Sequence, residues 1–338
     1  MNPCDIEAPL ETQARQRRSR STHAVPHPSL FLLALACVAV GSPAAAQEAS
    51  ADATQLRFAW PLETEARVSY RQVIEREGEG PEPTRLELEG EYVMHVHEHP
   101  SGFLVEHLAP LATRFGSSPP LTPDDPRRLV YSTMGILVPH YVVTEEGELL
   151  GVEGLPELAA AILAVLEPLE PRPAETESLM AELLDAARLT GQARERWNAL
   201  VGVWLDTELQ VGVAGATESE QTNPLVPSVV LPYLNQFELV GMEPCGAPQE
   251  SCARLAMVSF PNPIKLTSVI NEALQNMGMG HLTFDRLVQQ DGISLLTDPG
   301  TLLPHELTMS KLVEGTLRES GQVRRFRRFD LTRLVYSY

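Results

Sequence analysis

Histidines at alternate positions are the residues whose type and spacing point most directly to chemistry. His95, His97 and His99 end a stretch, Arg85–His99, in which apolar and polar side chains alternate. This period of two predicts a β-strand with one buried and one solvated face. Residues two apart on a strand project from the same face about 6.5–7 Å apart. Two of these imidazoles, His95 and His97, could therefore bind one zinc or copper ion.

A third metal ligand would have to come from a neighbouring strand. The residues Pro100-Ser101-Gly102 predict a turn, and Glu106 and His107 beyond it would pair close to His95. The alternative is that the histidines only extend a solvated face, because the same face is rich in glutamate further upstream. The sequence shows no second cluster of histidine and cysteine, and exposed polar histidines are therefore the favoured interpretation.

Motifs of known enzyme classes are missing from the sequence. It contains no G-x-S-x-G and no S-x-x-K pattern, and His305-Glu306 is not followed by the second histidine of an H-E-x-x-H zinc motif. Neither a dinucleotide-binding glycine fingerprint nor a phosphate-binding loop is present. These observations predict a protein without catalytic activity and without a cofactor.

The charge balance argues against a nucleic-acid partner. The chain carries a formal net charge of −19, and such a surface repels phosphate backbones and anionic membranes. One basic run, Arg324-Arg325-Phe326-Arg327-Arg328-Phe329, could form an anion-binding or partner-binding patch. Cross-strand ion pairs with the many acidic residues are the favoured explanation for it.

Residues 1–46 have the organisation of a secretory signal peptide. An arginine-rich part precedes an apolar run, Leu30–Val40, that is too short to span a bilayer, and Ala44-Ala45-Ala46 offers a cleavage site. Lipoprotein processing at Cys37 is the alternative, because Leu35-Ala36-Cys37 partly matches that signal. Both predict export to the periplasm or the extracellular space, and no later segment is apolar enough to cross a membrane.

Cysteine usage agrees with export. Cys245 and Cys252 are the cysteines that remain after removal of the leader, and a short loop with Gly246 and Pro248 separates them. In an oxidising compartment this spacing predicts a disulfide that closes a hairpin. A redox-active pair would need the two-residue spacing that is missing here.

Sequence typical of helices lies in the middle of the chain, between two halves whose patterns are typical of β-strands. Residues 155–206 are expected to form a helical insertion that begins near Pro156 and ends in an amphipathic helix. The apolar stripe of that last helix consists of Trp197, Leu200, Val201, Trp204 and Leu205. A second, shorter helix is expected over Ile264–Met277.

Strand-like segments occupy most of the remaining sequence, and Gly212–Asn223 is expected to be a loop. The segments expected to be strands are 66–76, 85–99, 103–112, 131–143, 149–152, 226–240, 253–260, 282–296, 303–317 and 323–338. Turns of hairpin length connect most of them, which predicts an antiparallel sheet. The expected fold is therefore α+β, with residues 47–338 as a single domain.

This layout resembles the exported half-barrel lipoprotein-carrier-like families of the LolA/LppX type. The resemblance rests on the long strands 85–99 and 303–317, on the helix at Trp197–Leu205 and on the corner Asp298-Pro299-Gly300-Thr301-Leu302-Leu303-Pro304. It departs from those families in its larger helical insertion. The resemblance implies a strongly curved antiparallel sheet, a half-barrel, that wraps a central group of helices and encloses an apolar cavity.

Such families imply that a hydrophobic ligand is bound without chemistry. The expected cavity lining combines the apolar face of one strand with the stripe of the helix, namely Leu86, Leu88, Tyr92, Met94, Trp197, Val201 and Trp204. The hypothesis is an exported protein that holds a lipid or a similar apolar molecule. The alternatives are an envelope structural or interaction module with a filled core, and a metal-binding protein that uses His95 and His97.

Overall fold

The computed structural model describes residues 53–78, 82–116, 119–122, 139–158, 160, 185–223, 226–246 and 251–338. The signal-peptide prediction for residues 1–46 lies outside these residues. So does most of the first part of the predicted helical insertion, although residues 155–158 are helical as expected. No helix in the described ranges has the length and apolar character needed to cross a membrane.

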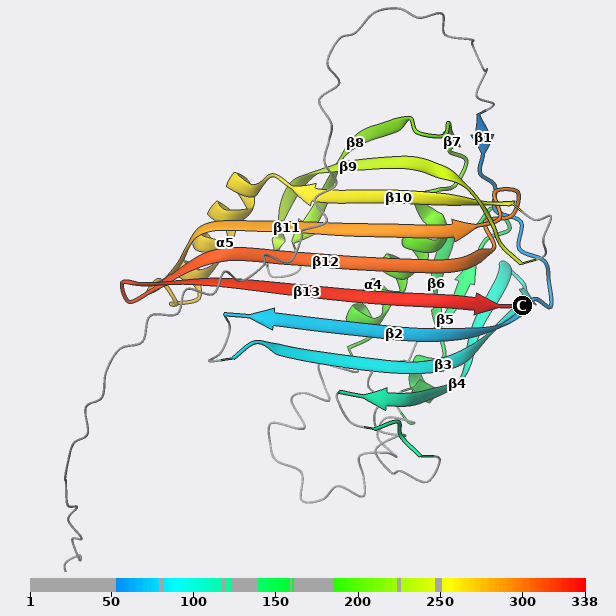
Figure 1. Cartoon of the computed structure of the whole chain (residues 1–338), viewed down its shortest axis with the longest axis horizontal. Coiled ribbons are helices and arrows are strands. Elements are labelled where there is room, and N and C mark those ends of the chain that lie inside the picture. Colours follow the sequence, from blue (N-terminus) through cyan, green and yellow to red (C-terminus); the bar gives the residue numbers. More distant parts are fainter. Residues whose placement is uncertain are drawn as a thin grey trace, which may run out of the picture. The chain divides into compact units, whose positions relative to one another are not determined.

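A large antiparallel sheet dominates the fold (Figure 1). In the described part of the chain it contains eleven strands in the order β6-β5-β4-β3-β2-β13-β12-β11-β10-β9-β8. Its strands are β2 (Glu65–Glu77), β3 (Thr84–His99), β4 (Gly102–Phe115), β5 (His140–Val143), β6 (Leu149–Glu153), β8 (Ala214–Asn223), β9 (Val226–Pro244), β10 (Ser251–Pro261), β11 (Leu282–Thr297), β12 (Pro304–Glu319) and β13 (Gln322–Ser337). The short strands β1 (Thr54–Gln55) and β7 (Glu208–Leu209) pair separately. The C-terminal strand β13 lies beside β2 and so joins the two halves of the chain.

Alternating side chains give the sheet one apolar face. Register places five leucines opposite one another across five neighbouring strands, and all five are fully buried. They are Leu334, Leu307, Leu295, Leu255 and Leu239. A one-residue slip of any of these strands would turn its leucine to solvent, so burial of this row fixes the register.

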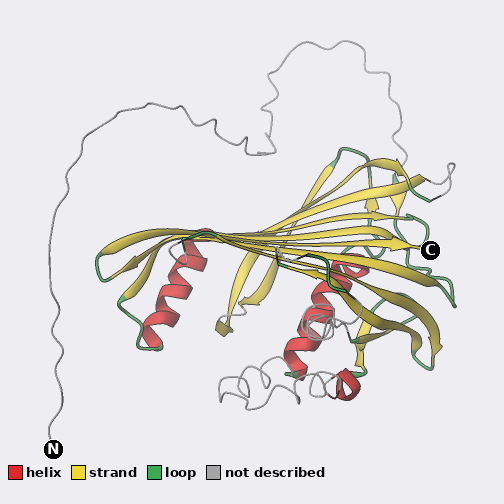
Figure 2. Ribbon diagram, turned by 60° about the horizontal axis from the view of Figure 1, so that its bottom comes forward, coloured by secondary structure: helices red, strands yellow, loops and turns green. Residues whose placement is uncertain are grey.

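The helices lie on the same face of the sheet, which we name the inner face (Figure 2). Among the described residues they include α4 (Ala186–Trp197), the π-helical turn η2 (Asn198–Gly202) and α5 (Pro263–Asn276). The α5 helix begins where expected, because Pro263 occupies its first turn and the Asn262 side chain accepts hydrogen bonds from the N–H groups of Ile264 and Lys265. Its residues Leu266 and Ile270 pack in a separate apolar cluster at one end of the sheet.

Two local expectations were wrong. The segment expected to be a loop contains β8, which is the edge strand beside β9. Its small and polar residues carry little strand signal, because the ladder is held by backbone hydrogen bonds at a solvated edge. The expected amphipathic helix is not regular either, since α4 ends at Trp197 and the Val203 N–H donates to the Asn198 carbonyl in a wider turn.

The expected fold class is correct in its antiparallel sheet and wrong in the balance between sheet and helices. The sheet is open, with β6 and β8 at its edges, and it dominates the described residues. Within the described residues, α4, η2 and α5 cover parts of one face, and no central group of helices wrapped by the sheet is seen there. The long hairpins explain the difference, because strands such as β9, with 19 residues, extend well beyond the short α4 and η2 segments.

The predicted disulfide is present and closes the turn between β9 and β10. Cys245 and Cys252 are bonded, and Leu296 packs against them. Their sequence separation of 7 restricts only a short loop of the unfolded chain, for which the loop-entropy relation gives about 2 kcal/mol.

Replacing both cysteines with serine should therefore lower the free energy of unfolding by about 2 kcal/mol. Urea denaturation of the double variant Cys245→Ser/Cys252→Ser, compared with the oxidised and the reduced wild type, measures this loss. Reduced wild type should match the variant. A loss below about 0.5 kcal/mol in both would show that the bond contributes nothing to stability.

Candidate functional site

The residues predicted to line a cavity are brought together on the inner face, with one exception. Leu88, Tyr92, Met94, Trp197, Val201 and Trp204 all belong to one buried cluster, and each is at most 6% exposed. Leu86 stands outside this cluster and is 39% exposed. The stripe of the irregular helix and the apolar face of β3 thus belong to the same core, in which α4 contacts β6 and η2 contacts β11 and β12.

Trp60, which the sequence reasoning missed, completes this cluster. It lies 3% exposed in the segment before β2, with its ring centroid 5.3 Å from that of Trp197. Each tryptophan N–H has a carbonyl partner, since Trp60 donates to Leu302, Trp197 to Gly147 and Trp204 to Ala199. Edge-to-face ring contacts and satisfied indole N–H groups stabilise this end of the inner face.

A cluster of tyrosines around Arg196 adjoins the tryptophans. Arg196 comes from the last turn of α4, and the phenols come from four different strands: Tyr70 in β2, Tyr92 in β3, Tyr141 in β5 and Tyr336 in β13. Register explains their meeting, because Tyr92 and Tyr336 both lie opposite Val68. We name these five residues the tyrosine–arginine cluster.

Burial sets the charge state of the tyrosine–arginine cluster. It raises the pKa of all four phenols, so they remain neutral at physiological pH. Burial lowers the pKa of Arg196, but this pKa still lies above its ordinary value, and the guanidinium stays charged. Among the described residues, Arg196 forms no ion pair with a carboxylate.

The Tyr141 hydroxyl is a second unusual group in this cluster. Its side chain is 1% exposed, and the hydroxyl oxygen is buried without a well-formed hydrogen bond to any described residue. Against the larger effect of burial, the nearby Arg196 guanidinium lowers its pKa through charge and side-chain hydrogen bonding, although this contact falls short of strict hydrogen-bond geometry. An unpaired buried hydroxyl costs about 1–3 kcal/mol, which a ligand acceptor would offset.

Partly exposed residues continue the inner face from the cluster toward α5. A row of apolar side chains, Phe237, Met257, Ile293 and Met309, packs against the edge of the core. The next row along the strands is polar and contains Asn235, Ser259, Asp291, Lys311 and Asp330. Asp291 accepts a hydrogen bond from Gln289 through one carboxylate oxygen, and its other oxygen is buried without a described partner. The inner face therefore offers apolar and polar contacts side by side.

The predicted metal-binding histidines lie on the opposite, outer face of β3. His95 and His97 are adjacent there, with ring centroids 3.8 Å apart. On the neighbouring strand Glu106 pairs with His95, as expected, and its carboxylate lies 2.9 Å from Nε2 of His97. His107 was wrong as a candidate ligand, since β4 turns its ring between Tyr92 and Tyr141 on the inner face.

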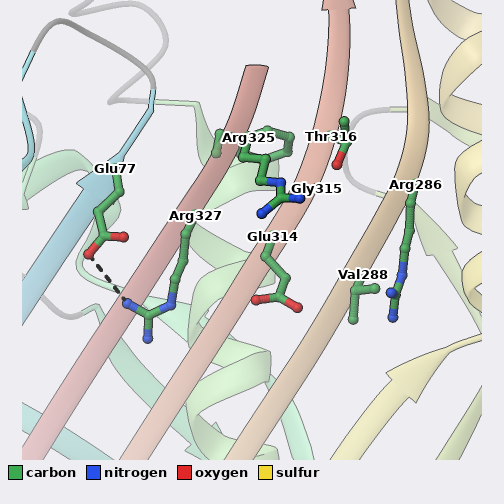
Figure 3. Close-up of a pocket in the computed structure, with 9 residues that line it drawn as sticks. Glu77, Arg286, Val288, Glu314, Gly315, Thr316, Arg325 and Arg327 are labelled. Carbon is green, nitrogen blue, oxygen red and sulfur yellow. Dashed lines mark ion pairs between the residues drawn. The ribbon is translucent and has the colours of Figure 1, made fainter. Parts of the chain in front are cut away.

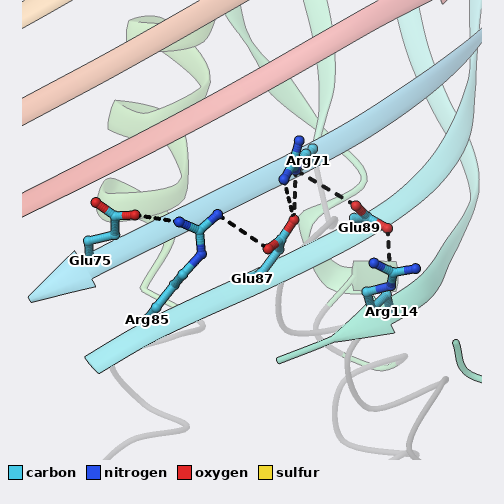
Figure 4. Close-up of polar contacts among 6 residues, drawn as sticks. All are labelled: Arg71, Glu75, Arg85, Glu87, Glu89 and Arg114. Carbon is cyan, nitrogen blue, oxygen red and sulfur yellow. Dashed lines mark hydrogen bonds and ion pairs between the residues drawn. The ribbon is translucent and has the colours of Figure 1, made fainter. Parts of the chain in front are cut away.

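Charged side chains form a ladder along the outer face of β2, β3 and β4 (Figure 4). Glu75, Arg85, Glu87, Arg71, Glu89 and Arg114 alternate in sign, with nearest N–O distances of 2.6 to 3.7 Å. Hydrogen bonding to Arg71 lowers the pKa of Glu87. Exposed pairs of this kind contribute about 0–1 kcal/mol each, so the ladder is the solvated face that the sequence predicted.

The basic run 324–329 pairs with acids as expected. Arg327 contacts Glu77 on the neighbouring strand at 3.9 Å, and Arg324 contacts Glu319 across the hairpin at 3.6 Å. Arg325 and Arg286 instead face a shallow hollow of about 450 Å³ that Glu314 also lines (Figure 3). Because side chains of both charges line this hollow, it favours neither an anionic nor a cationic ligand.

A helix pattern could have revealed Arg196, but nothing in the sequence could have revealed Trp60 as the neighbour of Trp197. Arg196 follows Ala193 by three residues and precedes Leu200 by four, and both are buried. A charged residue on the buried side of an amphipathic helix is a recognisable signal. The tyrosines meet it only through strand register and helix docking.

Comparison with known proteins gives little further information. No protein-family model matches the chain, and no curated protein matches it. A solved structure titled "Lipid-protein interactions in lipovitellin" matches with 11% identity and a TM-score of 0.40, covering 82% of this chain and 25% of that chain. The chain thus spans a quarter of the length of that protein. A likeness this weak establishes neither a shared fold nor a shared function.

Proposed function

We propose that this is an exported, non-enzymatic protein that binds an amphipathic molecule with an apolar chain and an anionic head on the inner face of its sheet. The observation that carries the proposal is Arg196, a guanidinium set among four neutral tyrosines without a carboxylate partner in the described residues. The anionic head would contact Arg196 and the Tyr141 hydroxyl. The apolar chain would lie along the row that begins at Met309.

Electrostatics favours an anion at this position. A charge that leaves water without a partner is costly, and the cost falls when an opposite charge meets it in a hydrogen-bonded pair. A guanidinium presents paired donors that match a carboxylate or a phosphate. Neutral phenols add donors without adding competing negative charge.

The row of partly exposed apolar side chains offers a surface for the apolar chain of the proposed ligand. Phe237, Met257, Ile293 and Met309 are partly exposed and continuous with the core. Covering apolar surface is favourable by about 25 cal/mol per Å², and methionine side chains adapt to chains of varied shape. The disulfide between Cys245 and Cys252 is compatible with an exported protein.

A filled-core interaction module is the second candidate. It is favoured by the close packing of Leu88, Tyr92, Met94, Trp197, Val201 and Trp204, the residues that a cavity would have to leave apart. In that case Arg196 would serve only to dock α4 on the sheet. Ligand binding distinguishes the two candidates.

Native mass spectrometry of the exported protein, before and after solvent extraction, tests the proposal. The expected result is a bound apolar mass that solvent releases, with uptake of added fatty acid or anionic phospholipid by the extracted protein. A clean protein mass together with no uptake of either probe would reject the proposal and leave the filled-core module.

Replacing Arg196 with methionine should weaken binding of a fatty acid at least tenfold, because the variant keeps side-chain length and loses the charge. Arg194→Met is the matched control, since Arg194 lies on the same helix and is exposed. Arg196→Lys should retain part of the affinity. Equal affinities in the Arg196 and Arg194 methionine variants, with both folded by circular dichroism, would contradict the role of Arg196.

A further inference from the structure

The strongest group outside the inner face is a set of metal-ligand side chains on the outer face of β3. Glu63, His95 and His97 each offer one ligand atom, and these atoms all lie within 4.8 Å of one another. Nε2 of His95 lies 3.5 Å from one Glu63 carboxylate oxygen, and Nδ1 of His97 lies 3.8 Å from the other. A divalent ion placed among them would need only small side-chain movements to reach bonding distances of about 2.0–2.2 Å.

Glu106 supplies the feature that distinguishes a metal site from simple ion pairs. Its carboxylate lies 2.9 Å from Nε2 of His97, on the side of the ring away from Glu63. A proton on Nε2 is donated to Glu106, which leaves the Nδ1 lone pair directed toward Glu63. Histidines that bind metals usually donate their other ring N–H to a carboxylate in this way, which fixes the tautomer and the ring orientation.

The backbone holds Glu63 beside the histidines. The Glu63 N–H donates to the Val96 carbonyl at 2.9 Å, and the Val96 N–H donates to the Thr64 carbonyl at 3.0 Å. Glu63 adopts a φ of 57°, a conformation that residues other than glycine rarely take and that recurs at functional sites. The segment before β2 is thus tied across the strand that carries both histidines.

We propose that Glu63, His95 and His97 bind a divalent transition-metal ion, with Glu106 as the group that orients His97. Two imidazoles and one carboxylate favour ions such as Zn²⁺ over Mg²⁺ or Ca²⁺, which prefer sites made only of oxygen. The side chains of His95 and His97 are 21% and 32% exposed, so water can complete the coordination. The site is independent of the inner face.

Bound metal would have a structural consequence. The segment before β2 carries Leu56 and Trp60, which are 0% and 3% exposed in the core. A metal bond between Glu63 and β3 would fasten this segment to the sheet. Binding to the folded state alone raises its stability, so Zn²⁺ should raise the melting temperature.

Zinc titration of the exported protein, produced without a histidine tag and stripped with a chelator, tests the proposal. Calorimetry should show one saturable site, and Zn²⁺ should raise the melting temperature by several degrees. The variant His95→Ala/His97→Ala should lose at least 100-fold in affinity, and Glu106→Gln should lose about 10–100-fold. Co²⁺ should give the visible absorption of a site with nitrogen ligands.

His99→Ala is the matched control. His99 continues the same face but contacts Glu153 at 3.6 Å, and its Nδ1 accepts a hydrogen bond from the Ser101 N–H. The control should bind Zn²⁺ as the wild type does. Absence of a saturable site in the folded wild type, or an equal loss in the His99 control, would overturn the proposal. An unchanged affinity in Glu106→Gln would overturn the role given to Glu106.

Discussion

Replacing Trp197 with alanine is expected to lower the free energy of unfolding by about 3–5 kcal/mol. The side chain is 1% exposed, and its ring meets Phe58, Trp60 and Tyr141 edge to face at centroid distances of 5.3 to 5.9 Å. These partners lie in segments far apart in the sequence, so no single neighbour can move to fill the space. The loss combines apolar burial with a remaining cavity.

The variant Trp197→Phe distinguishes the contribution of the aromatic ring from that of the indole N–H group. It keeps most of the aromatic contact and removes the hydrogen bond from Nε1 to the Gly147 carbonyl, which is 2.9 Å long. We expect it to cost about 1–3 kcal/mol, because the buried carbonyl loses its partner. This variant should therefore fall between wild type and the alanine variant.

Urea denaturation measures both losses from the shift in midpoint at constant slope. Leu150→Ala is the control, since Leu150 is 52% exposed, and it should change stability by less than about 0.5 kcal/mol. A loss below about 1 kcal/mol for Trp197→Ala would show that the core re-forms around the gap. In that case the contacts of Trp197 with its aromatic neighbours would not be what stabilises this end of the inner face.

Most strands could be predicted from the sequence because their signals are local. The alternation in residues 85–99 gives β3 (Thr84–His99) almost to the residue, and the helical spacing of apolar residues in Ile264–Met277 gives α5. The strand β8 could not be predicted in the same way, because its polar residues pair through the backbone at a sheet edge. The balance between sheet and helices depends on how hairpins stack together, which no local pattern contains.

The candidate sites show the same difference between residues with local signals and residues brought together by the fold. Residues close in sequence could be predicted, as with the disulfide of Cys245 and Cys252 and the pair His95 and His97. Glu63 reaches the histidines only because its backbone pairs with Val96, and that contact has no signature in the sequence. His107 was expected beside His95, but it pairs with Met94, so ordinary alternation turns its side chain to the inner face while Glu106, opposite His95, faces outward.

Acidification is expected to destabilise the protein through His107. Burial is the largest cause that lowers the pKa of His107, to about 3, and the charge of Arg196 lowers it further. The ring packs between Tyr92 and Tyr141, and its Nδ1 lies 3.0 Å from the Pro139 carbonyl. The folded protein therefore holds this imidazole neutral where an unfolded chain would protonate it.

The sign of the pH dependence follows from this difference. Between the unfolded pKa of about 6.5 and the folded pKa of about 3, the unfolded state binds one more proton than the folded state. Stability is thus complete above this window and is lost as the pH falls through it, at up to about 1.4 kcal/mol per pH unit. Because the His107 ring is partly exposed, we expect about 1–2 kcal/mol of loss by pH 5.

Denaturation of wild type and His107→Gln at pH 7.5 and pH 5 isolates this effect. Carboxylates of ordinary pKa remain largely ionised at pH 5, so the difference between the two proteins reports the imidazole. The wild type should lose about 1–2 kcal/mol more than His107→Gln over this interval. His281→Gln, a substitution at an exposed turn residue, should behave as the wild type does. Parallel pH profiles for the wild type and His107→Gln would mean that water or a movement of β4 relieves the charge. The tyrosine–arginine cluster would then be far more hydrated than its buried phenols indicate, and the low-dielectric anion site proposed around Arg196 would lose its physical basis.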